Sequence, residues 1–144
     1  MARIKIEGAP TYPFVTTIPI RISDINYGNH VGNDSILSII HEARMQFLGQ
    51  YGYTELNCGG VGLIMSDAGI EFKKELFYGD VIEVHIGVSN LSAVGFDIFY
   101  KIIKKEKDKA VIAVLAKTGM ICYNYELKKI AAVPAAIKEK FEIQ

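Results

Sequence analysis

Cysteine is scarce in this chain, with only Cys58 and Cys122 in 144 residues. The two lie far apart, and neither belongs to a cluster of residues with metal-ligand spacing. This argues against a disulfide framework and a structural metal site, so we expect no metal and no redox cofactor. Two isolated thiols are typical of a reduced, intracellular protein, and we expect a cytoplasmic location.

Net charge is also lacking, because 16 basic residues balance 16 acidic ones. Such a chain has no electrostatic footprint for nucleic acid, and it has no basic run that suggests a membrane surface. No apolar run approaches the length of a membrane span, and no signal-peptide core is visible at the start. Without repeats or linkers, we expect a single domain over residues 1–144.

Residues 33–51 have the pattern of one long helix, with Asn33 as its N-cap and Gly52 as its stop. Arg44 falls inside the apolar arc of this helix, and a buried guanidinium needs a carboxylate, so we expect an ion pair. The arc covers about half of the circumference, which indicates a helix enclosed by a curved sheet. Its members are Ile36, Leu37, Ile39, Ile40, Ala43, Phe47, Leu48 and Tyr51.

Apolar and polar residues alternate over 14–24, as in a half-buried strand. Ile18, Ile20 and Ile22 point one way, and continuing the alternation places Asp24 on the same apolar face. Pro19 cannot donate to a neighbouring strand and argues for an edge or a bulge.

Four further strands are expected, followed by a short C-terminal helix. The strands are at 61–76, with a bulge at Gly69, and at 81–91, 96–105 and 110–125, and Pro134 opens the helix over 135–141. The predicted class is α+β: an antiparallel sheet of about five strands, in consecutive meander, wrapped around one long central helix. Such a sheet leaves an edge strand unpaired, and pairing of edges in a twofold dimer satisfies it.

The most informative segment joins the first strand to the helix. It reads Arg21-Ile-Ser-Asp-Ile-Asn-Tyr-Gly-Asn-His-Val-Gly-Asn33, and His41-Glu-Ala-Arg44 follows on the helix. A helix N-terminus has N–H groups without internal partners and a partial positive charge, so it can hold a developing oxyanion. A carboxylate or imidazole beside it can activate water, and together these are the requirements of acyl transfer.

This segment resembles the N-terminal signature of the hotdog-fold acyl-CoA thioesterases of the 4-hydroxybenzoyl-CoA type. Their pattern is close to R-Y-x-D-x-D-x-x-G-H-V-N-N, with E-x-A-R further along the helix. The resemblance implies the hotdog fold for roughly residues 14 to 126, and its matching positions are Arg21, Asp24, His30, Val31, Asn33, Glu42, Ala43 and Arg44. The second Asp of the pattern attacks the thioester or activates water in that family, and here it is Asn26, a carboxamide that can do neither.

Seven residues are therefore candidates for a site. As catalytic residues we consider Asp24, Asn26, His30 and Glu42, and for the oxyanion and the substrate we consider Val31, Gly32 and Asn33.

Each candidate also has a structural interpretation. Asp24 is either a base or an extended cap of the helix, and Asn26 is either a donor to the carbonyl oxygen or a turn former. His30 lies on a turn outside the apolar rows, which favours a role in proton transfer. Asn33 is favoured as a cap, although its backbone N–H can still face a ligand, and Glu42 as a solvated or ion-paired helix residue.

The predicted function is hydrolysis of an acyl-CoA or acyl-carrier-protein thioester, bound between the subunits of a homodimer or homotetramer. One alternative is an enoyl-thioester hydratase on the same fold, because Asp24-Ile-Asn26…His30 is similar to the D-x-N-P-x-H pattern of those enzymes. A second alternative is a non-catalytic protein that binds acyl thioesters, which the loss of the Asp makes plausible.

Overall fold

The computed structural model describes residues 1–141 and 143. Its strands are β1 (Phe14–Pro19), β2 (Gly62–Phe72), β3 (Val81–Ser89), β4 (Gly95–Glu106), β5 (Lys109–Asn124) and β6 (Lys129–Ile130). Its helices are α1 (Asn33–Gly49) and α2 (Ala135–Lys140), and a 3-10 turn, Ile22–Asp24, lies between β1 and α1. No helix in the described part of the chain is long and apolar enough to cross a membrane.

The strands form one antiparallel sheet in the order β1-β3-β4-β5-β2, and the short β6 pairs with the end of β5. The predicted consecutive meander is thus correct for β3, β4 and β5 and wrong for β2, which pairs with β5 at the far edge. Connection lengths explain the difference. Residues 107–108 and 90–94 form tight turns between neighbours, whereas residues 73–80 between β2 and β3 are enough to cross the end of the sheet.

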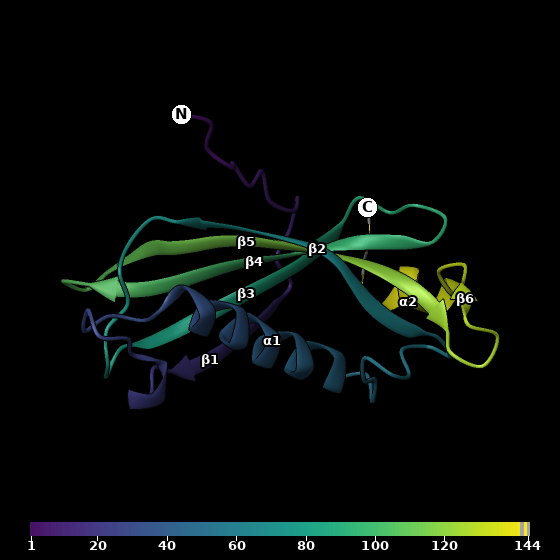
Figure 1. The fold of residues 1–144 in the computed structure, drawn as a ribbon, viewed down its shortest axis with the longest axis horizontal. Coiled ribbons are helices and arrows are strands. Elements are labelled where there is room, and N and C mark those ends of the chain that lie inside the picture. The colour runs from purple at the N-terminus through teal and green to yellow at the C-terminus, as the bar shows by residue number, and fades with distance from the viewer. Residues whose placement is uncertain (142, 144) are drawn as a thin grey trace.

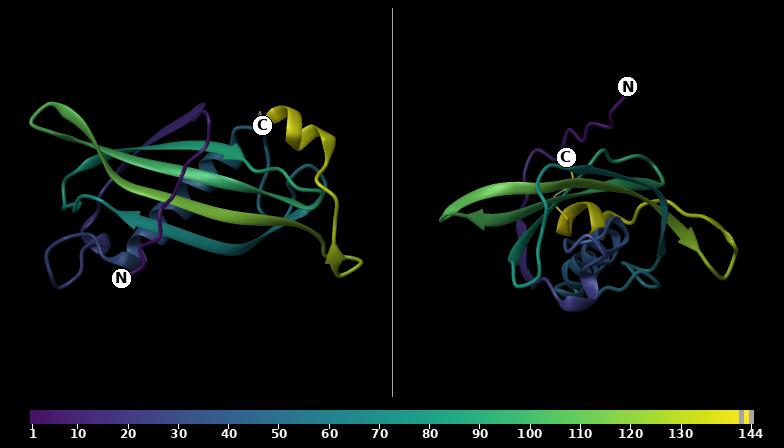
Figure 2. Two further views of the ribbon diagram at one scale, coloured as in Figure 1. Left: turned by 90° about the horizontal axis from the view of Figure 1, so that it is seen from above. Right: turned by 60° about the vertical axis from the view of Figure 1, so that its left-hand side comes forward.

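Helix α1 lies along the concave face of this sheet, and the sheet curves around it (Figures 1 and 2). The apolar arc of the helix meets inward-facing residues of β3, β4 and β5 in one continuous core. Phe47 and Leu48 are almost completely buried there, and burying such a side chain stabilises the fold by roughly 1.5–3 kcal/mol. The predicted α+β hotdog architecture is confirmed.

The first strand is shorter than the alternation suggested. It ends at Pro19, and Ile22 is 68% exposed instead of joining the inward row of Ile18 and Ile20. The cause is local: the backbone N–H of Arg21 donates to the Asp24 carboxylate at 2.8 Å, which closes the 3-10 turn. Asp24 is buried as expected, but through this turn and not through a longer strand.

Several other details of the elements also differ from the prediction. The N-cap of α1 is Gly32 instead of Asn33, and α1 ends at Gly49. Strand β2 covers Gly62–Phe72, because the N–H groups of residues 73 and 74 both turn to the carbonyl of Ala113. Its bulge lies between Met65 and Asp67, not at Gly69.

Residues 1–13, called here the N-terminal strap, cross the outer face of the sheet, as the left view of Figure 2 shows. Thr11 lies so close to Gly87 of β3 that a Cβ at residue 87 has no room. Nearer the N-terminus the strap contacts β2, where the Ile6 N–H donates to the Glu71 carboxylate at 2.8 Å. Phe99 alternates with the core residues of β4, so it faces outward, and it is nevertheless only 5% exposed. The strap therefore gives the sheet a second covered face.

Candidate functional site

The loop before α1 is closed by its own backbone. The N–H of Asn26 donates to the carbonyl of His30 at 3.0 Å, and the N–H of Asn29 donates to the carbonyl of Asn26 at 3.1 Å. Asn29 has a φ of 65°, a left-handed conformation that Asn tolerates better than most residues. The Asn26 side chain is part of the same closure, because its Oδ1 accepts from the N–H of Gly28 at 2.9 Å. This geometry supports the turn-forming interpretation of Asn26.

Two of the three predicted oxyanion donors are already used by the fold. The N–H of Val31 donates to the carbonyl of Leu76 at 2.8 Å, and the N–H of Gly32 donates to the carbonyl of Asp24 at 3.1 Å. The N–H groups of Asn33, Asp34 and Ser35 follow in the first turn of α1, and they donate to no group in the described part of the chain. These three groups, at the positive end of the helix, are the ones free to hold an anion.

His30 stands beside this helix end. Its Nδ1 lies 3.1 Å from the carbonyl of Val31, and since a carbonyl only accepts, Nδ1 carries the hydrogen. The other ring nitrogen, Nε2, is then the one that can accept a proton when the ring is neutral. His30, Val31 and Asn33 line one pocket of about 340 Å³, together with Ile36, residues 72–76 and Val114. This pocket, called here the helix-end pocket, brings together an imidazole and the start of α1.

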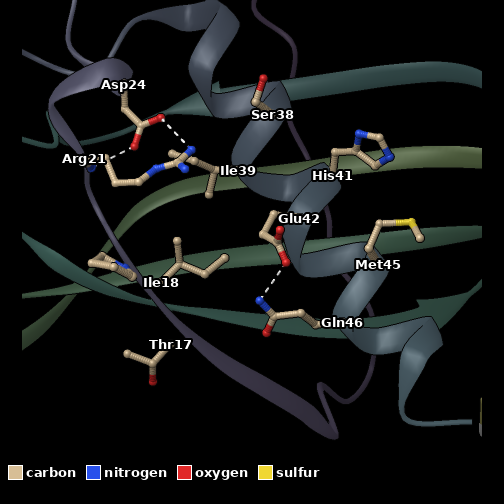
Figure 3. A pocket seen from close by; sticks show the side chains of 11 residues that line it. Thr17, Ile18, Arg21, Asp24, Ser38, Ile39, His41, Glu42, Met45 and Gln46 are labelled. Atoms are coloured by element: carbon tan, nitrogen blue, oxygen red, sulfur yellow. Dashed lines mark hydrogen bonds and ion pairs between the residues drawn. The ribbon is translucent and has the colours of Figure 1, made fainter.

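The two carboxylate candidates lie elsewhere. Asp24 and Glu42 line a different groove of about 420 Å³ between α1 and β1, shown in Figure 3. The Asp24 carboxylate is occupied by the N–H of Arg21 and lies 3.8 Å from the Arg21 guanidinium. Glu42 accepts from Nε2 of Gln46 at 2.8 Å and is exposed. The structure therefore separates both carboxylates from His30.

Arg44 has the partner that its place in the apolar arc requires. It is 5% exposed, and its Nε lies 3.7 Å from Oε1 of Glu55. Its Nη1 donates to the hydroxyl of Tyr100 at 3.0 Å, and that hydroxyl lies 2.7 Å from Oγ1 of Thr118. Burial raises the pKa of Tyr100, so its hydroxyl keeps its proton. The predicted ion pair is confirmed, and it belongs to a buried polar chain through the core.

Sequence reasoning missed the lysines of the helix-end pocket. Lys73 and Lys74 line it from the segment that follows β2. The signal was present, because two consecutive lysines directly follow a strand, but their place in the same pocket as His30 depends on the pairing of β2 with β5. Within the described residues no group of three or more His, Cys, Asp or Glu side chains is arranged to hold a metal ion.

Comparison with known proteins gives a consistent result. The thioesterase-like superfamily matches residues 20–141. The 1,4-dihydroxy-2-naphthoyl-CoA hydrolase of Microcystis aeruginosa is 30% identical over 122 residues, covering 83% of this chain and 86% of that protein. A hypothetical protein from Aquifex aeolicus has a similar structure, with a TM-score of 0.77 and 25% identity over 90% of this chain and 99% of that one. Another, from Staphylococcus aureus and solved with CoA, has a TM-score of 0.78 and 17% identity over 90% of this chain and 81% of that one.

Proposed function

The chain belongs to the thioesterase-like superfamily, and we propose that it hydrolyses the thioester of an acyl-CoA or an acyl carrier protein to a free acid and a thiol. The observation that carries the proposal is the family match, which covers residues 20–141 and so includes the whole helix-end pocket. The relative from Microcystis is a hydrolase of a CoA thioester, which supports CoA as the carrier and makes hydroxylated aromatic acyl groups the first to test.

In this proposal the thioester carbonyl oxygen lies at the first turn of α1. The N–H groups of Asn33, Asp34 and Ser35 are free there, and hydrogen bonds to a developing negative charge are worth several kcal/mol in a site that excludes water. His30 Nε2 takes a proton from water, and the water oxygen bonds to the carbonyl carbon. The carbon–sulfur bond then breaks, and the imidazolium returns the proton to the departing thiolate.

The remaining candidates have supporting roles in this mechanism. Asp24 closes the turn that positions the loop, and the Asn26 side chain closes the loop itself by accepting from the N–H of Gly28. The N–H groups of Val31 and Gly32 fix the loop to Leu76 and Asp24. Glu42, in the groove between α1 and β1, is the alternative base if His30 is not required.

Thiol release is the direct test. The protein is supplied with 1,4-dihydroxy-2-naphthoyl-CoA, a fatty acyl-CoA and crotonyl-CoA, while free thiol and enoyl absorbance are followed. We expect thiol release that depends on His30. Loss of enoyl absorbance without thiol identifies a hydratase, and tight binding without either product identifies a non-catalytic binding protein, which the engaged Asn26 side chain would favour.

We further propose that the protein is a homodimer, or a dimer of dimers, joined through β2. This strand is an edge of 11 residues with one side unpaired, and Ile64 and Met65 on it are exposed, Met65 by 45%. Antiparallel pairing of two β2 strands satisfies those backbone groups and covers these side chains. Light scattering at micromolar concentration tests this, and a monomer there contradicts it.

The proposed location is the cytoplasm. Cys58 and Cys122 are both free and buried, and unpaired thiols are usual where the environment is reducing. Fractionation of the producing cells tests the location, and recovery outside the cytoplasm contradicts it.

A further inference from the structure

Two pockets meet at the end of β2. The helix-end pocket includes Phe72, and so does a second pocket of about 660 Å³ between β2 and the start of the N-terminal strap. The second pocket is lined by residues 2–5 and by Ile70, Glu71 and Phe72. Because β2 ends at Phe72, a ligand can pass from one pocket to the other around this end of the strand. Phe72 is 54% exposed at the crossing.

Four cationic side chains surround this crossing. Lys73 and Lys74 come from the segment after β2, and Arg3 and Lys5 come from the strap. All four are exposed. Lys73 pairs with Glu71 at 3.3 Å, whereas Arg3, Lys5 and Lys74 have no ion-pair partner among the described residues. We call these four side chains the cationic patch.

Contacts with β2 hold the strap in a position in which Arg3 and Lys5 line the second pocket. Its Ile6 N–H donates to Glu71, and Ile4 and Ile6 pack over Gly69, where a Cβ would lie only 3.1 Å from the end of the Ile6 side chain. The hydrogen bond from Ile6 and the charge of Lys73 lower the pKa of Glu71, so this carboxylate is ionised and already paired. The charge of Lys5 contributes to the same shift, so Glu71 offsets part of the charge of Lys73 and Lys5, whereas Arg3 and Lys74 have no ion-pair partner among the described residues.

We propose that the cationic patch binds the phosphate groups of a CoA thioester, and that the ring of Phe72 stacks on the adenine base. This inference rests on the proposed function and names the part of the substrate that binds outside the helix-end pocket. The acyl end lies at α1, the pantetheine arm passes around the end of β2 at Phe72, and the nucleotide lies against the strap. Ammonium and guanidinium groups are the usual donors to phosphate, and aromatic rings stack on bases.

The strap supplies two of the four cationic side chains, and it lies outside the residues that the family match covers. Arg3 and Lys5 precede residue 20, where the family match begins. The charge is local, because the whole chain has equal numbers of acidic and basic residues. A site of this kind selects a small polyanion and not an extended one such as nucleic acid.

Binding of CoA itself is the first test, because it does not depend on turnover. The variant Arg3→Gln/Lys5→Gln/Lys74→Gln is compared with Lys128→Gln/Lys129→Gln/Lys138→Gln, which removes three exposed lysines in and around β6 and α2. We expect the Kd for CoA, measured by calorimetry, to rise about tenfold or more in the first variant and to stay unchanged in the second. Phe72→Leu should also weaken binding of CoA, and it should weaken binding of phosphopantetheine, which lacks the adenine base, to a smaller extent.

Hydrolysis distinguishes this inference from the proposed function. The same acyl group is presented on CoA and on pantetheine, which lacks phosphate. We expect the double variant Arg3→Gln/Lys5→Gln, which leaves the lining of the helix-end pocket intact, to raise KM for the CoA thioester only, with kcat unchanged. Equal Kd for CoA in the wild type and both triple variants overturns the inference even if both thioesters are hydrolysed. Failure to hydrolyse either thioester while the Kd values differ as expected overturns the proposed hydrolysis and leaves the phosphate site supported.

Discussion

Arg44 of α1 donates from Nη1 to the hydroxyl of Tyr100 on β4, at 3.0 Å, inside the space between helix and sheet. The two residues are 56 positions apart in the chain, and both are buried. The hydroxyl of Tyr100 also contacts Thr118 of β5 at 2.7 Å, so one phenol links the helix to two central strands. A buried guanidinium that lost this contact would have one hydrogen-bond partner fewer in a place that water does not reach.

Tyr100→Phe is therefore expected to lower the free energy of unfolding by about 1–3 kcal/mol, because it leaves Arg44 and Thr118 without their shared partner. Urea denaturation measures it. Tyr123→Phe on β5 is the matched control, since the Tyr123 hydroxyl has no hydrogen bond in the described structure, and it should change stability by less than about 0.5 kcal/mol. Equal effects of the two substitutions would contradict a stabilising role for the chain from Arg44 to Thr118.

His30→Ala should lower kcat/KM by about 10²- to 10⁴-fold if Nε2 takes the proton from water. His85→Ala is the control, because His85 is on β3 and pairs with Glu83 at 3.0 Å. Thermal unfolding of both variants checks that they are folded. Unchanged turnover in a folded His30→Ala variant would remove His30 from the mechanism and make Glu42 the next base to test.

Asn26→Asp restores the acidic residue that the family pattern has at this position, and we expect it to raise thioester hydrolysis, by up to about 10²-fold. The new carboxylate keeps one oxygen for the N–H of Gly28, as Oδ1 does now, and leaves the other free. Asn29→Asp adds the same charge to the same loop and should give no gain. A gain of the same size in both variants would mean that charge in the loop, and not a base at residue 26, is responsible.

Two substitutions of Asp24 distinguish a positioning role from a catalytic one. Asp24→Ala removes the acceptor for the N–H of Arg21 and should cost about 0.5–2 kcal/mol of stability. Asp24→Asn keeps an acceptor oxygen, so we expect a smaller loss of stability and most of the activity. The measurement is urea denaturation alongside thiol release. Abolished turnover in a folded Asp24→Asn variant would assign the base to Asp24 instead.

Alkaline pH should destabilise the protein through its cysteines. Burial, and then the nearby Cys122, raise the pKa of Cys58 to about 12, and burial raises that of Cys122 to about 11. An unfolded thiol titrates near 8.5. Below that pH the stabilisation is fully present, and it is lost as the pH rises toward 11–12, because the unfolded chain releases protons that the folded chain retains.

Urea denaturation between pH 7 and pH 10.5, with a reductant present, measures this decline. Cys58→Ala should lower stability at neutral pH by removing buried volume, yet give a shallower decline with pH. An identical pH slope in wild type and variant would show that other groups cause the alkaline loss.

Local pattern was sufficient for much of the fold. The half-circumference apolar arc of residues 33–51 and the alternation in the later strands reflect the periods of helix and strand, which each segment has without its neighbours. The need of Arg44 for a carboxylate was predictable for the same reason, because its place in the arc depends only on helical geometry. Which carboxylate it finds, Glu55, was not predictable, since that residue lies in a loop.

Tertiary structure alone decided the layout of the candidate site. Asp24, His30 and Glu42 are close in sequence, yet the helix end separates them, with His30 in one pocket and the two carboxylates in another. The pairing of β2 with β5, not β3, brings Lys73 and Lys74 into the same pocket as His30, and the strap brings Arg3 and Lys5 to the end of β2. Periodicity shows which face of a segment is buried, but the neighbour of that segment depends on connection lengths and on packing over the whole sheet.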